Sequence, residues 1–405
     1  MDQAVSPELQ YMLLVFGLFI VPRALQRFRL PSAVTCVSIG AALNIGFHIL
    51  HGDHTVKLLA TLGIVSMFLF AGLEVDFGEL RQGRRVLIQH VGVQLLLLAI
   101  GGWVLHAALG LQPRAALLFA LALFTPSTGF ILDSLPGFGL TTEERFWVKS
   151  KAIASELVAL LVLFLTIQST GVTTLGLSAL ALAAMVVLLP PVFRGFARLI
   201  APFAPKTEFT FLVIVALLCA LVTRELGVYY LVGAFVVGLT AVRLRRDLPE
   251  LSSEKLLGGV ELFASFFIPF YFLNAGLHLR AEHFSWTSLA IAGALLVLVL
   301  PIRIFRVALH RRLALRESWK VGTRIGTAVI PTLVFTMVIA EILQERFGLA
   351  PQFFGGLVIF ALVNTLVPGF ILRLPPPEFE TPEAPRTPGG LSKDEGHPNA
   401  RQAET

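Results

Sequence analysis

An acidic residue stands inside an apolar segment that is long enough to cross a bilayer: KSKAIASELVALLVLFLTI, from Lys149 to Ile167. Glu156 lies well inside it, directly after Ser155. A charge at membrane depth is costly, and intramembrane acids usually mark a path for ions or protons. A carboxyl group removed from water can hold either a proton or a cation, and that competition exchanges one for the other. Ser155 could add a hydroxyl ligand. The alternative is that Glu156 is a permanently salt-bridged packing residue.

Oxygen ligands for a cation are available in the preceding apolar segment, LFTPSTGF. Pro126 removes a backbone donor and disfavours helix at Thr125, and Gly129 relaxes the chain further. The hydroxyls of Thr125, Ser127 and Thr128 crowd around the freed carbonyls, and these are the hard oxygens that a dehydrated alkali cation needs. The alternative is a proline kink whose hydroxyls satisfy their own helix.

A second proline break occurs at a related position, in AVIPTLVF around Pro331, with Gly326 shortly before it. Pro126 and Pro331 are separated by nearly the same number of residues as the two Ala-Gly-Leu strings that begin at Ala71 and Ala275. Agreement of the two spacings indicates an internal repeat. We therefore expect Gly129, Gly326 and Pro331 to belong to two symmetric helix breaks.

Three basic residues could offset charge at this site. Lys149 has helical spacing to Glu156, so it either points at the glutamate or extends toward the aqueous end of its helix. Arg303, inside VLVLPIRIFRVALHRR, could pair with a core carboxylate or with carbonyls of the broken helices, whereas Arg306 is expected to be interfacial. Arg324 could face the same cavity. For Lys149 in its outward orientation, the sequence offers Asp133, Glu143 and Glu144 as partners.

The composition places these residues in a membrane. Of 405 residues, 56% are hydrophobic and only 14% are charged, with a mean hydropathy of +0.80. Soluble domains carry about 25% charged residues. The net charge of +6 comes from loop arginines and does not indicate nucleic-acid binding. Cys36 and Cys219 lie in apolar segments and are expected to be small core residues rather than a disulfide.

The periodic apolar segments predict an all-α polytopic protein with about thirteen transmembrane helices, the fifth and twelfth broken and crossing. The predicted ranges are 8–25, 32–50, 55–75, 84–109, 114–134, 143–168, 173–198, 208–225, 228–243, 258–278, 285–310, 317–343 and 350–373. Residues 374–405, rich in proline and charge, are expected to form a disordered cytoplasmic tail.

Loop charge and the repeat predict the topology. Arginines and lysines concentrate in the loops after odd-numbered helices, which predicts an external N-terminus and a cytoplasmic C-terminus. The repeat carries the third helix onto the tenth and the fifth onto the twelfth. The repeat therefore displaces each helix by seven positions. Because seven is an odd number, the two halves must cross the membrane in opposite directions. This inverted-topology repeat is typical of secondary transporters, whose sites lie near the midplane where paired helices are broken.

Several segments in order resemble the monovalent cation:proton antiporter superfamily, specifically its Kef-type and Nap-type bacterial branch, over about residues 8–373. They are RLPSAVTCVSIGAAL, FLFAGLEVDFGELR, TPSTG, ELGVYYLVGAFVVGLT and FFIPFYFLNAGLHL. The resemblance implies that Glu156 stands at the ion-binding aspartate, Ser155 at the polar residue before it, and Arg303 at a basic residue of the eleventh helix. It also implies a homodimer with elevator-like exchange of access.

By the same resemblance, residues 1–83 and 171–283 form interface helices, and residues 84–170 and 284–373 form the core transport helices. We expect a transporter of the inner (plasma) membrane, not an enzyme, that exchanges Na⁺ or K⁺ for protons without a cofactor or resident metal. Because Glu156 is the single candidate acid, the exchange is expected to be electroneutral. The alternatives are an organic-anion transporter, with Lys149, Arg303 and Arg324 binding a carboxylate, and a non-transporting sensor.

Overall fold

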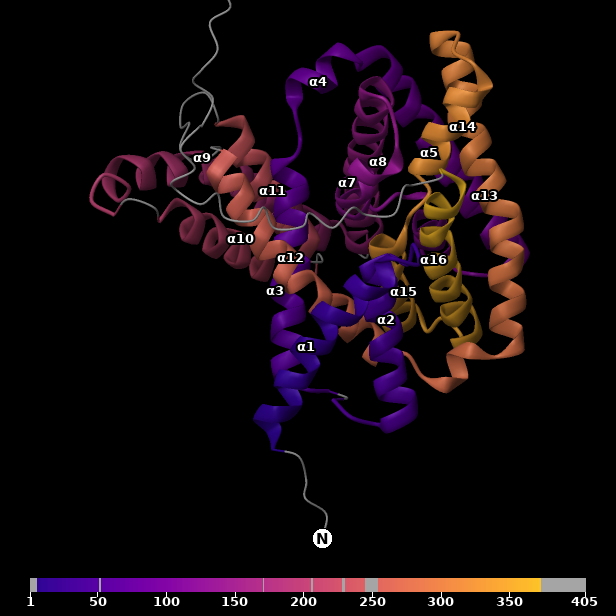
Figure 1. Ribbon diagram of the computed structural model, residues 1–405. Coiled ribbons are helices and arrows are strands. Elements are labelled where there is room, and N and C mark those ends of the chain that lie inside the picture. Colours follow the sequence, from indigo (N-terminus) through magenta and orange to yellow (C-terminus); the bar gives the residue numbers. More distant parts are fainter. Residues whose placement is uncertain are drawn as a thin grey trace, which may run out of the picture.

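The computed structural model describes residues 6–50, 52–169, 171–204, 207–227, 230–244 and 254–372, and the predicted tail lies outside them. The described residues form helices and connecting turns with no strand, which confirms the all-α fold class (Figure 1). In that view α9, α10 and α11 lie to the left and α13, α14 and α16 to the right, with α3 and α12 between them.

The helices follow one another with short connections. Their bounds are α1 Pro7–Gln26, α2 Ser32–Ala42 continued by a π-helical turn Leu43–Phe47, α3 His54–Leu73, α4 Phe77–Gln82, α5 Arg84–Leu109, α6 Pro113–Phe124, α7 Thr128–Ser134 followed by a 3₁₀ turn Leu135–Phe138, α8 Thr142–Gln168, α9 Val172–Leu199, α10 Glu208–Glu225, α11 Tyr230–Arg243, α12 Glu254–Leu277, a 3₁₀ turn Ala281–Phe284, α13 Trp286–Leu315, α14 Trp319–Ala328, α15 Leu333–Phe347 and α16 Pro351–Ile371.

Each of the thirteen predicted ranges coincides with one helix or with a broken pair of helices. Within the described part of the chain, nine helices are long and apolar enough to span a membrane, and the bent pair α14–α15 brings the number to as many as ten. The segments Ser32–Phe47 and Leu231–Arg243 are apolar but shorter. The chain is therefore a multi-pass membrane protein, while the count of thirteen spans remains a prediction.

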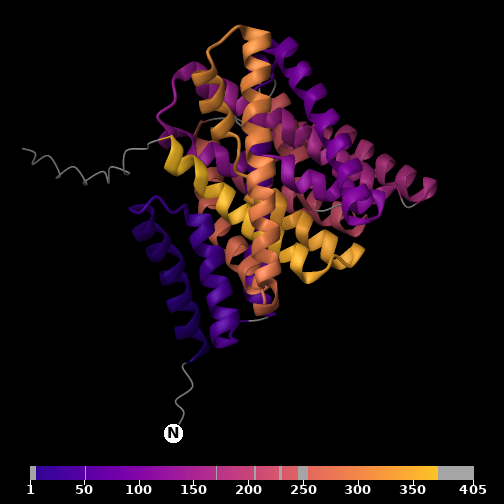
Figure 2. The same ribbon diagram turned by 90° about the vertical axis from the view of Figure 1, so that its right-hand side faces the viewer.

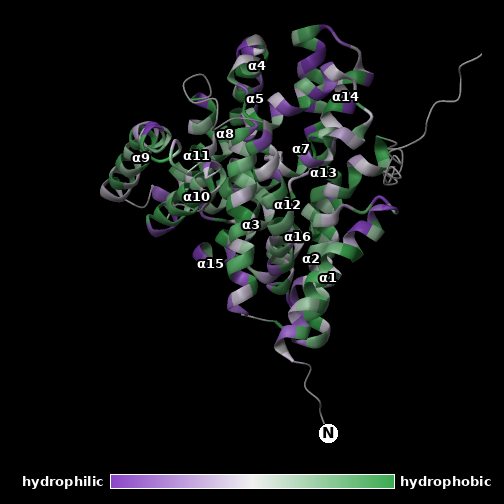
Figure 3. Cartoon of the chain, turned by 60° about the vertical axis from the view of Figure 1, so that its left-hand side comes forward, coloured by the Kyte–Doolittle hydropathy of each residue, from purple (hydrophilic) through white to green (hydrophobic). Residues whose placement is uncertain are grey.

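The outer helices carry apolar side chains on their exposed faces. Trp103 on α5, Val187 on α9 and Val297 on α13 are each about 70% exposed, as expected of side chains that contact lipid. Hydrophilic residues gather toward the end of the bundle that holds α4 and α14 (Figure 3). The long helix α13 runs along one side of the bundle (Figure 2).

The internal repeat has a structural counterpart in two glycine crossings. A Cβ on Gly72 of α3 would lie 3.0 Å from the Cα of Gly238 on α11. A Cβ on Gly276 of α12 would lie 2.9 Å from the Cα of Gly40 on α2. Small residues allow helix backbones to approach this closely in membranes. The glycines of the two Ala-Gly-Leu strings therefore occupy similar positions, each at a close crossing with another helix.

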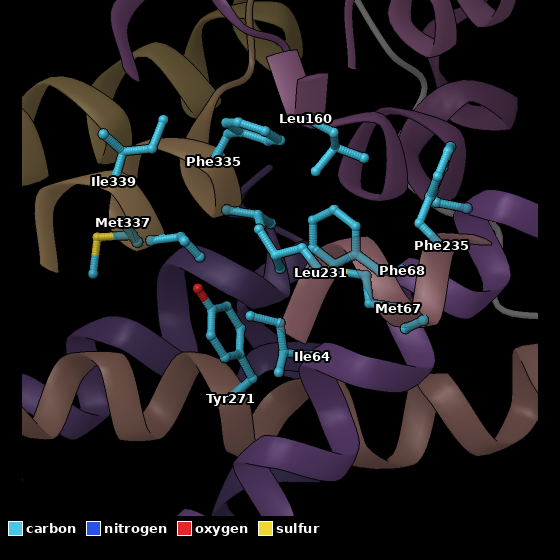
Figure 4. Close-up of a cluster of buried hydrophobic side chains, with 14 of the residues drawn as sticks. Ile64, Met67, Phe68, Leu160, Leu231, Phe235, Tyr271, Phe335, Met337 and Ile339 are labelled. Atoms are coloured by element: carbon cyan, nitrogen blue, oxygen red, sulfur yellow. The ribbon is translucent and has the colours of Figure 1, made fainter. Parts of the chain in front are cut away.

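The helix that carries Glu156 has a firmly defined start. Thr141 and Glu144 form a capping box at the N-terminus of α8: the Glu144 N–H donates to the Thr141 hydroxyl (3.2 Å), and the Thr141 N–H donates to the Glu144 carboxylate (2.9 Å). Leu160, one turn after Glu156, packs in an apolar cluster with Phe68 of α3 and Phe335 of α15 (Figure 4). The cap and this cluster fix the position of Glu156.

Candidate functional site

The two broken helices meet at their breaks. Helix α6 ends at Phe124 and α7 begins at Thr128, and α14 ends at Ala328 and α15 begins at Leu333 with a bend of 52°. The Ser127 N–H donates to the Pro331 carbonyl at 2.8 Å. The Thr336 hydroxyl donates to the Ala122 carbonyl at 2.7 Å. The prediction of two broken, crossing helices is confirmed.

Side chains from neighbouring helices satisfy the backbone groups that the breaks free. Gln94 of α5 donates to the Phe124 carbonyl (3.2 Å), and Arg303 of α13 donates to the Val329 carbonyl (2.9 Å). Both carbonyls lie at C-terminal ends of half-helices, where the helix dipole places partial negative charge. Asn364 of α16 accepts from the Thr332 N–H (3.2 Å) and donates to the Thr332 hydroxyl (2.8 Å).

Glu156 lies against the first break, in the middle of α8, and is 2% exposed. It lines a cavity of about 10 Å³. The other lining residues come from α3, α15 and the first break: Met67, Phe68, Ala71, Ser127, Thr128, Gly129 and Val334. Among the described residues, Glu156 Oε2 and the hydroxyls of Thr125 and Thr128 are buried without a hydrogen-bond partner. Buried oxygens of this kind can bind a proton or a cation, and we call this cavity the acidic cavity.

A larger cavity of about 470 Å³ adjoins the acidic cavity, because Met67 and Gly129 line both. Its walls include the carboxylates Glu74, Asp133 and Glu261. A further cavity of about 490 Å³ is lined by the opposite end of α3, from Lys57 to Ile64, and by residues of α12 and α15. Of these two cavities, only the first shares lining residues with the acidic cavity and so lies next to Glu156.

Two of the three basic residues predicted to offset charge at Glu156 do not line its cavity. Lys149 pairs with Glu74 (Nζ to Oε2, 3.1 Å), a partner that sequence analysis did not consider. Arg324 donates to the Glu144 carboxylate (2.9 Å) and to the Gly139 carbonyl (2.9 Å). Lys149 therefore takes the second of its two expected orientations, away from Glu156 but with a different partner, and Arg324 does not face the cavity of Glu156. Both basic side chains satisfy carboxylates beyond the site.

Ser155 and the two glycines also differ from expectation. The Ser155 hydroxyl lies 3.0 Å from His90 Nε2 and lines a different cavity from Glu156. Gly129 lies in the first turn of α7, and Gly326 lies inside α14 rather than at its break. A Cβ on Gly326 would lie 3.2 Å from the Cα of Ile304. Gly326 therefore allows α14 to approach α13 closely, and Val329 to Thr332 form the second break.

A buried basic cluster was missed by sequence analysis. Lys151, 1% exposed, has its Nζ 3.4 Å from His90 Nδ1 and 3.2 Å from His310 Nδ1. Arg306, which was expected to be interfacial, donates from Nη1 to the Gln94 side chain. Arg303, Arg306 and His310 are spaced by three and four residues, and a search for polar residues on one helical face would have found them.

Taken together, two helix breaks in equivalent halves of the chain, joined through their backbones beside a buried acid, define an inverted-repeat secondary transporter. Residues 13–375 match the family described as "Sodium/hydrogen exchanger, transmembrane". The chain therefore belongs to the sodium/hydrogen exchanger family.

Named relatives agree with this assignment. "Probable Na(+)/H(+) antiporter 3" of Methanocaldococcus jannaschii is 22% identical over 366 residues, which cover 88% of this chain and 93% of that protein. "Na(+)/H(+) antiporter NhaS5" of Synechocystis is 24% identical over 348 residues, covering 83% of this chain and 49% of the relative, so the chain spans about half of its length.

Among solved structures, a sodium proton antiporter of Methanocaldococcus jannaschii determined at pH 8 aligns with a TM-score of 0.65 and 14% identity, covering 90% of this chain and 95% of that one. At this identity the likeness shows the fold alone. It confirms the predicted antiporter-like architecture.

The role of Asn364 at the second break is testable. Asn364→Leu keeps a similar volume but leaves the buried Thr332 N–H without its acceptor, which costs about 1–3 kcal/mol. We expect a lower midpoint of thermal unfolding in detergent. The matched control, Asn274→Leu, changes an asparagine in the wall of the 490 Å³ cavity and should unfold close to the wild type. Equal midpoints for the wild type and Asn364→Leu would contradict the role given to Asn364.

Proposed function

We propose that the chain exchanges a monovalent cation, Na⁺ or K⁺, for protons at Glu156. The observation that carries this proposal is the buried, unpartnered Glu156 carboxylate oxygen beside the first helix break. The relatives support it, since they are named as Na⁺/H⁺ antiporters. Intramembrane acids that face a cavity commonly belong to ion or proton pathways.

Competition for one carboxylate couples the two ions. A dehydrated alkali cation requires hard oxygen ligands. Glu156 provides charged oxygen, and Thr125 and Thr128 provide hydroxyls whose oxygens are otherwise unpartnered within the described chain. Ser127 and Pro126 shape the break, since the Ser127 N–H bonds across to Pro331. A proton on Glu156 removes the charge that holds the cation, so each ion displaces the other.

The placement of the two large cavities supports elevator-like alternating access. The 470 Å³ cavity has walls from α2, α3 and α12 on one side and from α7 and α8 on the other. The 490 Å³ cavity likewise lies between α3, α10 and α12 and the helices α15 and α16. Sliding of a core group, residues 84–170 and 284–373, past an interface group, residues 1–83 and 171–283, would close one cavity and open the other.

Orientation and assembly are part of the same proposal. The distribution of loop arginines and lysines supports a plasma-membrane transporter with its N-terminus outside and its C-terminus in the cytoplasm. In that orientation the 470 Å³ cavity, at the Glu74 end of α3, opens toward the cytoplasm. The family resemblance supports a homodimer formed by the interface group.

An organic-anion transporter would require Lys149, Arg303 and Arg324 to converge on one pocket. Lys149 instead lines the 470 Å³ cavity and pairs with Glu74, and Arg324 bonds to Glu144. Arg303 lines a cavity of only about 10 Å³. The geometry therefore favours cation exchange.

Glu156→Gln should abolish exchange in proteoliposomes, because it keeps the side-chain volume and removes the titrating charge. The measurement is dissipation of an imposed pH gradient on addition of Na⁺, K⁺ or Li⁺. The control is Glu143→Gln, the same substitution at an exposed position on the same helix, which should exchange like the wild type. Cation-driven gradient dissipation by Glu156→Gln at the wild-type rate would refute the assignment.

The exchange should be electroneutral. One carboxylate that binds one proton or one monovalent cation gives one-for-one exchange, and Arg303 and Arg306 cannot release a proton during the cycle. An imposed membrane potential should therefore not drive uptake of the cation. Uptake driven by the potential would show a second proton carrier, and Lys151, buried between two histidines, is the residue to test first.

A further inference from the structure

A second small cavity borders the first break and a different face of α8 from the acidic cavity, and its walls are strongly basic. Its volume is about 10 Å³, and its lining residues are His90, Pro126, Lys151, Ser155, Arg303, Arg306 and Val329. Three of these carry formal positive charge and none is acidic. We call it the basic cavity. Because Pro126 lines it, the basic cavity borders the same helix break as the proposed cation site at Glu156.

The two arginines have only neutral acceptors as partners within the described chain. Arg303 donates to the Val329 carbonyl, and Arg306 donates to the Gln94 amide oxygen. Arg303 Nη1 and Arg306 Nε are buried with no hydrogen-bond partner among the described residues. A buried lysine can lose its proton, whereas a guanidinium in a protein stays charged. Positive charge therefore persists in the basic cavity whatever the state of Lys151.

The nearby acids do not compensate this charge. Glu317 forms a two-pronged ion pair with Arg311. Glu156 lines the acidic cavity and, if the proposed function holds, carries either a proton or a cation, so its site is neutral in both loaded states. Buried charge that lacks a counter-charge is strongly unfavourable. Within the described residues, the only offsetting charge is therefore the partial negative charge at the C-terminal ends of α6 and α14, and an added anion would complete the compensation.

We propose that the basic cavity binds one small monovalent anion of halide size. A cavity of about 10 Å³ has room for a single monatomic ion or water molecule, which excludes organic anions. The ligands are the free N–H groups of Arg303 and Arg306, with the Lys151 ammonium and the Ser155 hydroxyl as further donors. Two of these residues are contributed by α8 and two by α13, and α5, which packs against α8, adds His90.

The anion has a consequence for cation binding. Positive charges next to the break repel a cation at Glu156, and in a medium of low dielectric constant that repulsion is large. A resident halide offsets it without moving during the cycle. Cation exchange should therefore weaken when halide is replaced by an anion too large for the cavity.

The test is halide-dependent thermal unfolding of the purified full chain in detergent. Choline chloride or choline bromide is titrated against choline gluconate at constant pH and ionic strength, so that no transported cation is present. We expect a saturable rise in the unfolding midpoint, because halide at about 100 times its dissociation constant shifts the folding equilibrium about 100-fold. Identical midpoints in halide and gluconate would overturn the proposal and indicate that the cavity holds water only.

Variants test whether the rise in the unfolding midpoint comes from halide bound in the basic cavity. Arg306→Gln should lose the halide response, whereas Arg312→Gln, an exposed arginine later on the same helix, should keep it. If Arg306→Gln does not fold, bromide located by anomalous scattering in the wild type takes its place. An unchanged response in Arg306→Gln, or bromide located elsewhere, would overturn the assignment. Glu156→Gln should retain the full halide response, so failure of the exchange mechanism and failure of the anion site give different results.

Discussion

The backbone contact between Ser127 and Pro331 is the constraint on which the rest of the site depends. Two helices can stop in the middle of a membrane only if the N–H and C=O groups that they free find partners. Here one break partly satisfies the other, at 2.8 Å, and Gln94, Arg303 and Asn364 bond to freed groups that remain. The crossing brings hydroxyl oxygens to the depth of Glu156 while the apolar cluster around Phe335 excludes water.

Helix α8 separates two kinds of charge at this crossing. Glu156 and Ser155 are adjacent in sequence and therefore point to different faces, one toward the acidic cavity and one toward His90 and the basic cavity. Glu156 and the two arginines therefore line separate cavities at the same helix break. This arrangement keeps Glu156 free of a permanent ion pair within the described residues, so its carboxylate stays available to a mobile ion.

Much of the fold could be predicted from sequence because membrane-spanning helices are recognised by the length and apolar composition of their segments. The breaks could be predicted from Pro126 and Pro331, and the repeat from the two Ala-Gly-Leu strings, whose glycines mark similar helix crossings. Side-chain direction could not be predicted. Lys149 shares helical spacing with Glu156, but it pairs with Glu74, which directly follows α3. The basic cavity draws its walls from α5, α8 and α13, and no local pattern brings such distant residues together.

Release of protons on cation binding tests the central claim most directly. Purified protein in weakly buffered detergent solution, at a pH where Glu156 is partly protonated, is mixed with Na⁺ or K⁺ while the pH of the solution is followed. Competition for one carboxylate predicts that protons appear in solution as cation binds, approaching one per cation as the starting pH is lowered, and that none appear with Glu156→Gln. Saturable cation binding that releases no proton at any pH would contradict the account.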